Sequence, residues 1–262
     1  MGVAVAATAS FGADVLERLA AKVDVTFLLT RPDAAQGRGR KLAPPPAKVA
    51  AVRLGIPVLQ PERPELPTDP VDAVVIAAYG LLVPEALLES VPWLNVHPSL
   101  LPRWRGAAPV ERAILAGDDV TGVTIHETVK ELDAGPIAAQ EAFPIRPDDD
   151  TGAVLGRAAE VAARLLVDVL RSPSFTPQSE EGATYAEKIH PADRRLDLDD
   201  PLDAWRRVRA LSPHIGAWTE MHGRRVTIWR ARLDDGRFVP LEVQPEGRRR
   251  MRYEEFLRGV RA

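Results

Sequence analysis

The amino-acid sequence predicts an α/β protein, a Rossmann-like, doubly wound, mostly parallel sheet followed by a small β-rich domain. Short apolar strands alternate with amphipathic helices over residues 3–171, which is typical of parallel sheets with helical crossovers. The run at residues 73–78 is apolar throughout, as expected for a strand covered on both faces. Residues 218–232 instead indicate a β-hairpin around Gly223, with alternating Val226, Ile228 and Ala231, and residues 239–243 indicate a further strand.

The first elements follow this alternation closely. We expect a strand at residues 3–8, a helix at 13–21 with Gly12 in the preceding turn, and a strand at 25–29. That turn lacks the G-x-G-x-x-G pattern, so no dinucleotide site is predicted. Residues 31–46 are expected to form a loop, because two glycines and three consecutive prolines interrupt them.

The remaining elements of the first domain share the same strand–helix spacing. Pro84 is placed to open one helix, and Gly117 to close another. We expect strands at residues 57–59, 73–78, 93–97, 123–127 and 137–143, and helices at 47–54, from 84, at 108–116 and at 152–171.

Residues 172–188 are expected to form a linker, because proline, serine and glycine punctuate them. The predicted domains are therefore a catalytic domain at residues 1–178 and a C-terminal domain at residues 179–262. In the second we expect a helix at 201–211, a hairpin at 218–232 and a strand at 239–243, together a small β-barrel-type domain.

Composition limits the class of protein before any motif does. The 262 residues are 45% hydrophobic and 27% charged, which suits a globular protein of one large or two moderate domains. No apolar run approaches the ~20 residues of a membrane helix, and no basic segment precedes an apolar one as in a secretory signal. The absence of cysteine excludes disulfides and thiolate sites. We expect a cytoplasmic protein without a membrane segment.

Charge is distributed unevenly around the net value of −3. Residues 1–178 carry a net −5 and residues 179–262 a net +2, and from Ala204 onward every basic side chain is arginine. Residues 31–53 hold six basic side chains against one acidic. Both regions suit contacts with a polyanion, because the planar fork of arginine reads phosphate and mobile basic loops capture it. The alternatives are a solvated arginine-rich surface and an ordinary mobile loop.

The stretch from Leu94 to Pro109 carries the strongest functional signal. Asn95 and His97 lie two apart in a predicted strand, so both side chains leave on one face. Pro98 then ends the strand. Polar groups at the carboxyl end of a parallel strand lie where open α/β sheets bind ligands.

These side chains suit acyl-group chemistry. An asparagine amide can hold a developing oxyanion, and a histidine can donate to it or move a proton. Asp133, in a turn closed by Gly135 between two predicted strands, supplies a carboxylate. Taken one at a time, Asn95 could cap a turn, His97 could line the rim of a pocket and Asp133 could be an ordinary turn residue. The five histidines are scattered without metal-ligand spacing, so no metal site is expected.

The segments Asn95–Pro109, Thr121–Ile125 and Leu132–Gly135 resemble the formyltransferase family that uses 10-formyltetrahydrofolate. Residues 31–48 and 185–189 resemble those members that act on initiator methionyl-tRNA, in translation initiation, rather than on glycinamide ribonucleotide or sugars. The resemblance runs to about Leu233 and is strongest over residues 73–145.

This resemblance implies roles for particular residues. Catalysis would rest on Asn95, His97 and Asp133, with Asp133 favouring the imidazolium form of His97 and accepting the proton of the attacking amine. The expected walls of the folate pocket are Tyr79, Gly80, Leu81, Val83, Ser99, Leu100, Leu101 and Pro102. The expected tRNA-binding residues are Arg38, Arg40, Lys41, Arg206, Arg224 and Arg225. The chain would act as a monomer without a metal.

Three departures from the family pattern accompany the resemblance. Residues Ala7–Ser10 replace the expected Gly-Thr-Pro turn, His126 replaces a hydrophobic residue, and the C-terminal domain resembles a shortened OB-type barrel. The alternatives are an N-formyltransferase acting on a sugar nucleotide or other small amine, a Ser99–His97–Asp133 hydrolase and a non-catalytic RNA-binding protein. No Gly-x-Ser-x-Gly elbow surrounds Ser99, and the intact Asn95, His97 and Asp133 argue against the RNA-binding alternative.

Overall fold

The computed structural model describes residues 2–36, 41–68 and 70–261. These form two compact units that are interleaved along the chain. Unit 1 combines Met1–Arg105, Gly122–Ala142 and Gly156–Thr184, and unit 2 combines Gly106–Thr121, Phe143–Leu155 and Tyr185–Ala262. The predicted division into domains at residue 178 stays a prediction, because each spatial unit draws on separate stretches of sequence.

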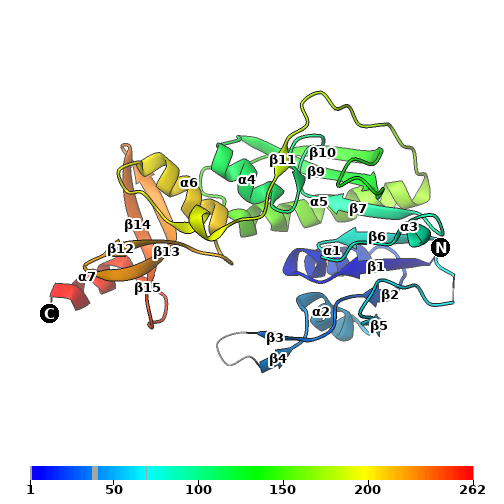
Figure 1. Cartoon of the computed structure of the whole chain (residues 1–262), viewed down its shortest axis with the longest axis horizontal. Helices are drawn as coiled ribbons and strands as arrows, with labels where there is room; N and C mark the ends of the chain where they lie inside the picture. Colours follow the sequence, from blue (N-terminus) through cyan, green and yellow to red (C-terminus); the bar gives the residue numbers. More distant parts are fainter. Residues whose placement is uncertain (1, 37–40, 69, 262) are drawn as a thin grey trace. The chain divides into compact units, whose positions relative to one another are not determined.

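Unit 1 is built on a seven-stranded sheet with the order β10-β9-β7-β6-β1-β2-β5 (Figure 1). All neighbouring pairs from β7 to β5 are parallel, whereas β9 runs antiparallel to β7. This confirms the predicted α/β class with its mostly parallel sheet. The strands are β1 (Val3–Ala7), β2 (Val25–Leu29), β5 (Val58–Leu59), β6 (Ala73–Ala77), β7 (Trp93–His97), β9 (Val120–Glu127) and β10 (Ile137–Pro144).

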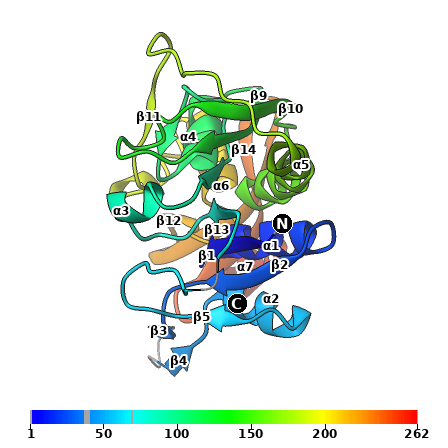
Figure 2. The ribbon, with the colours of Figure 1, turned by 90° about the vertical axis from the view of Figure 1, so that its right-hand side faces the viewer.

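Helices cover both faces of this sheet. In Figure 2, α1 (Ser10–Ala20), α2 (Pro46–Leu54) and α5 (Thr151–Arg171) lie on one side of it, and the short α3 (Glu85–Leu88) lies on the other. Helix α1 begins earlier than predicted and contains Gly12. A Cβ on Gly12 would lie 2.3 Å from the carbonyl oxygen of Ala77, so glycine here lets the helix approach β6 closely.

The sheet order places the predicted site at the carboxyl ends of adjacent strands. Strand β1 lies inside the sheet and is fully buried, with β2 on one side and β6 on the other, so the order of strands reverses at this point. The core beside it is built from Ala4, Ala6, Phe27, Leu29, Val74, Tyr79 and Trp93. The segments that follow β6 and β7 therefore extend from a well-packed core. They lie at the edge of the sheet where α/β proteins bind ligands.

The prediction of loop over residues 31–46 was wrong in part. Two three-residue strands, β3 (Ala34–Gln36) and β4 (Lys41–Ala43), pair antiparallel within it (Figure 1). The two glycines, at residues 37 and 39, lie outside the described residues, and the three prolines follow β4, so the proline signal does not exclude a hairpin this short.

Unit 2 is built on an antiparallel sheet with the order β12-β13-β14-β15. Helix α6 packs against α4 and against β13, burying Val208 and Leu211. The elements of this unit are α4 (Pro109–Ala116), β11 (Tyr185–Ala186), the 3-10 helix η1 (Pro191–Arg194), α6 (Pro201–Leu211), β12 (Ala217–Met221), β13 (Arg224–Asp234), β14 (Arg237–Pro245), β15 (Met251–Arg252) and α7 (Tyr253–Arg261), with part of β8 (Arg105–Gly106).

The β-rich character of the C-terminal part is confirmed, and the predicted helix at 201–211 and hairpin at 218–232 are both present. The four strands form one antiparallel sheet with β12 and β15 at its ends. The turn Asp235–Gly236 joins β13 directly to β14, which accounts for the short connection seen in the sequence. Helix α7, η1 and the two-residue strands β8, β11 and β15 were not predicted. No helix among the described residues is long and apolar enough to cross a membrane.

Candidate active site

Strand β7 presents Asn95 and His97 together, as the alternation of side chains along a strand requires. His97 is almost fully buried, and Asn95 is partly exposed. On the neighbouring antiparallel strand β9, His126 lies directly opposite Asn95, and Thr124 lies opposite His97. The end of β7 thus carries two polar side chains in a mostly apolar frame.

His97 has a defined hydrogen-bonding pattern. Its Nε2 lies 2.7 Å from the backbone oxygen of Trp104, and since a carbonyl can only accept, Nε2 carries the ring hydrogen. Its Nδ1 lies 3.6 Å from Oδ2 of Asp133. A neutral ring therefore turns an unprotonated Nδ1 toward the carboxylate.

The pKa of His97 is lowered from its ordinary value of 6.5, chiefly because burial penalises the charged ring. The charge of Asp133 and the carbonyl of Trp104 act in the opposite direction but with a smaller effect. Asp133 therefore favours the imidazolium as predicted, but the penalty of burial is larger, so the pKa of His97 is lowered overall. Desolvation, which the sequence did not reveal, outweighs the ion pair.

Asp133 stands in the turn between β9 and β10, with a positive φ of 49°. Two residues later, a Cβ on Gly135 would lie 1.8 Å from the backbone oxygen of Glu127, so only glycine fits there. The turn is therefore held tightly against the end of β9. This close approach brings the carboxylate of Asp133 to both Asn95 and His97.

A glutamine and an arginine that were not predicted support this turn. The side-chain nitrogen of Gln178 donates to the backbone oxygens of Asp133 and Gly135 at 2.9 and 2.6 Å. The buried Arg105 in turn donates to the side-chain oxygen of Gln178 and pairs with Glu180. Gln178 lies in the stretch predicted to be a linker. The sequence shows the composition of this stretch, but not which residues its side chains contact.

Both hydrogens of the Asn95 amide are engaged. Its Nδ2 lies 3.1 Å from Oδ1 of Asp133 and 3.1 Å from Nε2 of His126. The Nδ1 of His126 lies 2.8 Å from the backbone oxygen of Glu127, so that nitrogen carries the hydrogen and Nε2 accepts. Donation from Asn95 to an oxyanion therefore requires one of these two bonds to be given up.

Ser99 is fully buried, and its hydroxyl donates to the backbone oxygen of Arg103 at 2.7 Å. Among the described residues, no hydrogen bond joins this hydroxyl to the ring of His97, whose Nε2 is directed at the backbone oxygen of Trp104. This geometry does not support a Ser99–His97–Asp133 nucleophile. The backbone N–H of Ser99 donates to the oxygen of His97, and its backbone oxygen accepts from the hydroxyl of Thr124, so these groups also have partners within the protein.

The other predicted folate-pocket residues lie on two loops of unit 1. Tyr79 is buried in the core, and Leu81 and Val83 pack against it. Leu101 is buried, while Leu100 and Pro102 are half-buried. The backbone oxygen and nitrogen of Leu101 are held by the side chains of Gln140 and Thr124. Both loops thus have fixed, largely apolar walls.

The loop after β6 combines buried apolar side chains with a few polar groups that have no partner among the described residues. Gly80 is exposed with a φ of 78°, and the backbone N–H groups of Gly80 and Leu81 have no hydrogen-bond partner among the described residues. The hydroxyl of Tyr79 is buried without a partner in the same described set, and burial raises its pKa to about 12. Apolar walls with a few polar groups are typical of small-molecule sites.

The predicted tRNA-binding residues have different surroundings. Arg38 and Arg40 lie outside the described residues, and Lys41 is exposed on β4. Arg224 is exposed, and Arg225 is exposed over the ring of Trp218. A Cβ on Gly117 would lie 2.2 Å from the guanidinium of Arg206, so that arginine covers the end of α4. Arg207 and Arg209 of the same helix donate to backbone oxygens within unit 2.

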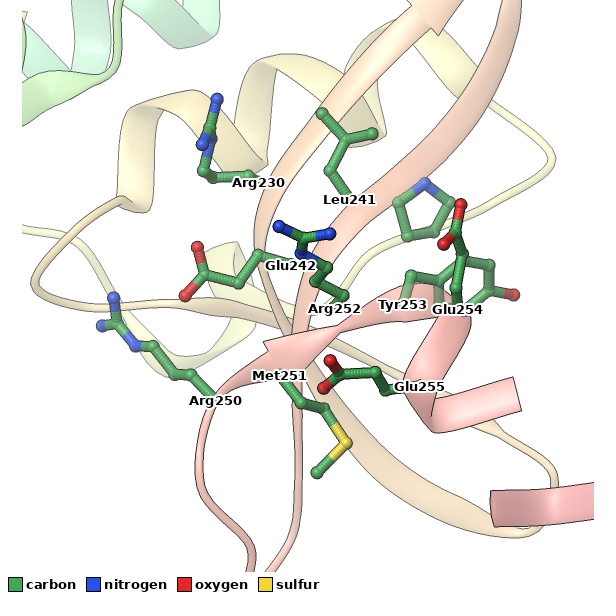
Figure 3. A pocket seen from close by; sticks show the side chains of 10 residues that line it. Arg230, Leu241, Glu242, Arg250, Met251, Arg252, Tyr253, Glu254 and Glu255 are labelled. Atoms are coloured by element: carbon green, nitrogen blue, oxygen red, sulfur yellow. The ribbon is translucent and has the colours of Figure 1, made fainter. Parts of the chain in front are cut away.

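A hollow of about 560 Å³ lies in unit 2, beside β14, β15 and the start of α7 (Figure 3). Its charged lining consists of three arginines, Arg230, Arg250 and Arg252, and three glutamates, Glu242, Glu254 and Glu255. Because the positive and negative side chains are equal in number, the hollow has no electrostatic preference for an anion. No group of acidic, histidine or cysteine side chains within the described ranges could hold a metal ion.

Two family profiles match the sequence. One, described as formyl transferase, matches residues 1–170, and the other, described as the formyl transferase C-terminal domain, matches residues 188–240. Among curated relatives, methionyl-tRNA formyltransferase of Paracoccus denitrificans is 41% identical over 97% of this chain and 95% of its own length. The enzyme of the same name from Acidothermus cellulolyticus is 40% identical over 91% of this chain and 90% of its own length.

Solved structures show the same fold at low identity. Methionyl-tRNA formyltransferase from Clostridium thermocellum aligns with a TM-score of 0.66 and 16% identity, covering 94% of this chain and 98% of the other. HypX from Aquifex aeolicus, in complex with tetrahydrofolic acid, aligns with a TM-score of 0.69 and 18% identity over 99% of this chain. This chain spans only 47% of HypX.

Proposed function

Because this chain belongs to the formyl transferase family, among its methionyl-tRNA formyltransferases, we propose that it transfers the formyl group of 10-formyltetrahydrofolate to the α-amino group of initiator methionyl-tRNA. The observation that carries the proposal is the meeting of Asn95, His97 and Asp133 at the end of β7. It occurs in a chain that is similar to these enzymes over nearly its whole length.

The site needs no protein nucleophile, because the α-amine attacks the formyl carbon itself. A free α-amine has a pKa of about 7.7–8.0, so a useful fraction is neutral near pH 7. Folate supplies an activated formyl group on its nitrogen. The amine–carbon bond forms, the bond from carbon to that nitrogen breaks, and one proton moves from the amine to the departing nitrogen.

His97 and Asp133 are placed to carry that proton. The unprotonated Nδ1 of His97 faces Oδ2 of Asp133 at 3.6 Å, so two acceptors border one gap. A proton that enters the gap is stabilised by both, and can leave again toward the departing nitrogen. The pair therefore acts as one base and then as one acid.

Asn95 is the candidate donor to the negative charge that builds on the formyl oxygen. One of its N–H groups must leave its present partner to do so. The bond to Asp133 weakens as this carboxylate takes up a proton, because a protonated carboxyl is a poorer acceptor. We place the oxyanion on the N–H that now points to Asp133.

The test is a formyl-transfer assay with charged initiator tRNA, and with an amino-sugar nucleotide as a competing acceptor. We expect turnover with the tRNA, a loss of ~10²–10³ in kcat for Asn95→Ala, and a loss of ~10²–10⁴ for His97→Ala. His214→Ala, which removes an exposed histidine of unit 2, is the control and should match the wild type. Turnover with the amino sugar alone would assign the enzyme to small-amine substrates.

A further inference from the structure

His126 is a buried histidine whose side chain is turned toward the catalytic candidates. Its side chain is 2% exposed, and its Nε2 lies 3.1 Å from the Asn95 amide nitrogen and 3.6 Å from Oδ1 of Asp133. Its position follows from the register of the sheet, in which His126 on β9 stands opposite Asn95 on β7. It is thus the cross-strand neighbour of the residue proposed to bind the oxyanion.

The protonation pattern of His126 is fixed by its other neighbour. Because Nδ1 donates to the backbone oxygen of Glu127, a neutral His126 must accept at Nε2. The acceptor it offers meets one N–H of Asn95, and Asp133 accepts the other. The Asn95 amide is therefore locked with its nitrogen, not its oxygen, toward both partners.

We infer that His126 is a positioning residue for the reaction proposed above. By accepting one N–H of Asn95 through the Nδ1–H tautomer, it fixes the amide plane and leaves the second N–H, now on Asp133, for the formyl oxygen. Without an acceptor at this place, the amide can rotate about its side-chain bond, and its oxygen can face the developing negative charge. This inference rests on the proposed function only for its kinetic consequence, not for its geometry.

Packing alone would give a different result. If His126 only filled space between β7 and β9, leucine of similar size would serve as well, and glutamine would have no special merit. If His126 acts as an acceptor, glutamine should replace it, because its side-chain oxygen can reach the place of Nε2. His126→Leu and His126→Gln therefore form a matched pair.

The first experiment reads the amide itself. Asn95 is the only asparagine in the chain, so a protein grown with asparagine labelled with ¹⁵N in the side-chain amide gives a single NH₂ pair in its spectrum. We expect one of the two protons to shift upfield in His126→Leu and to return in His126→Gln, with no change in the control His214→Leu. The ¹⁵N spectrum of the wild-type histidines should show His126 as the Nδ1–H tautomer. The inference would be overturned if His126 is the Nε2–H tautomer, or if the two amide proton shifts of Asn95 are unchanged in His126→Leu.

The second experiment reads the reaction. Loss of one orienting hydrogen bond should lower kcat of His126→Leu by about 3–10-fold, with the KM for each substrate changed by less than about 2-fold. His126→Gln should recover most of this loss. In an Asn95→Ala background, where there is no amide to orient, His126→Leu should add no more than about 2-fold.

These outcomes separate the inference from the proposed function. A wild-type protein that does not formylate methionyl-tRNA would contradict the proposed function, while the NMR spectra would still decide the role of His126. An active wild type with an equal loss from His126→Leu in both backgrounds would overturn the inference alone. If His126→Leu does not fold, the tautomer of His126 in the wild type and the kcat of His126→Gln still test the inference. It requires the Nδ1–H tautomer and a kcat close to that of the wild type.

Discussion

At the scale of single residues, burial rather than ion pairing governs the state of His97. Its lowered pKa means that the ring stays neutral in the folded protein at pH values where an exposed histidine would gain a proton. A neutral ring with its hydrogen on Nε2 suits a base that takes a proton at Nδ1. Burial thus prepares this residue for proton transfer and also makes the protein sensitive to acid.

The sign of this sensitivity follows from linkage. Between about pH 6.5 and the lower pKa of the folded state, the unfolded chain binds a proton at His97 and the folded chain does not. The free energy of unfolding therefore falls as pH drops below about 6.5, and this contribution is constant above it. We expect the stability of the wild type relative to His97→Gln to decrease from pH 7.5 to pH 5 in urea-unfolding experiments. The control is His214→Gln, which removes an exposed histidine and should change stability equally at every pH. If the stability difference between the wild type and His97→Gln is also the same at every pH, His97 is not a buried neutral ring.

The sequence predicted Asn95 and His97 as a pair because a strand places alternate residues on one face. It predicted Asp133 through the turn closed by Gly135 and through family resemblance. It did not assign a role to His126, Arg105 or Gln178. Their contacts depend on the register between β7 and β9 and on the return of a distant segment, neither of which a local pattern contains.

At the scale of elements, the turn that carries Asp133 depends on support from outside itself. A positive φ at Asp133 is a costly conformation for a residue with a side chain, and it persists only where its surroundings hold it. Gln178 provides that support by bonding two backbone oxygens of the turn, and Arg105 holds Gln178 in place.

Replacing Gln178 with methionine should therefore loosen the turn and move the carboxylate away from His97. We expect kcat to fall by about 10–100-fold, since a misplacement of about 1 Å at a catalytic group can cost ~10²-fold. The melting temperature should change by only a few degrees, as for about 1 kcal/mol in a chain of this size. Gln244→Met, which removes a comparable glutamine in the unit 2 sheet, should leave kcat unchanged. Equal kinetic losses in both variants would point to general destabilisation instead.

Element boundaries were predicted well where the local signals are strong. Strand β7 and helix α6 coincide with the predicted ranges, and α4 ends at Gly117 in a left-handed conformation as expected. The start of α1 was misplaced because Gly12 was assigned to a turn, whereas it serves a close contact with β6. The strands of the hairpin β3–β4 have only three residues each, too few to show a periodic pattern, and helix α7 was missed although its apolar residues follow the helical period.

At the scale of the whole molecule, exposed basic side chains are the candidate contacts for a large polyanionic substrate. Several arginines of the C-terminal region are occupied internally, Arg194 by the backbone oxygens of Ile215 and Gly216, and Arg207 and Arg209 by others. The exposed Lys41, Arg224 and Arg225 are free of such bonds to backbone in the described part of the chain. Composition alone could not separate these two groups, because both are arginine-rich surface in the sequence.

We expect the triple replacement of Arg38, Arg40 and Lys41 by glutamine to lower kcat/KM for charged tRNA and to flatten its dependence on salt. Each phosphate contact contributes roughly 0.7–0.9 to the slope of log K against log salt. The double replacement of Arg224 and Arg225 should act in the same direction. Arg164→Gln is the control, because the charge of Arg164 is already paired with Glu141. Wild-type slopes in both multiple variants would mean that tRNA is held elsewhere.

The interleaving of the two units has a consequence for biosynthesis. Helix α4, with its buried Val110, Ala113 and Ile114, belongs to unit 2 and packs against α6, yet α6 ends 95 residues after α4 does. At ~5–20 residues per second, the ribosome needs about 5–19 s to deliver that partner. During this interval the nascent chain exposes the apolar side of α4. The order of synthesis therefore makes α4 a natural place for a chaperone to hold this protein as it emerges from the ribosome.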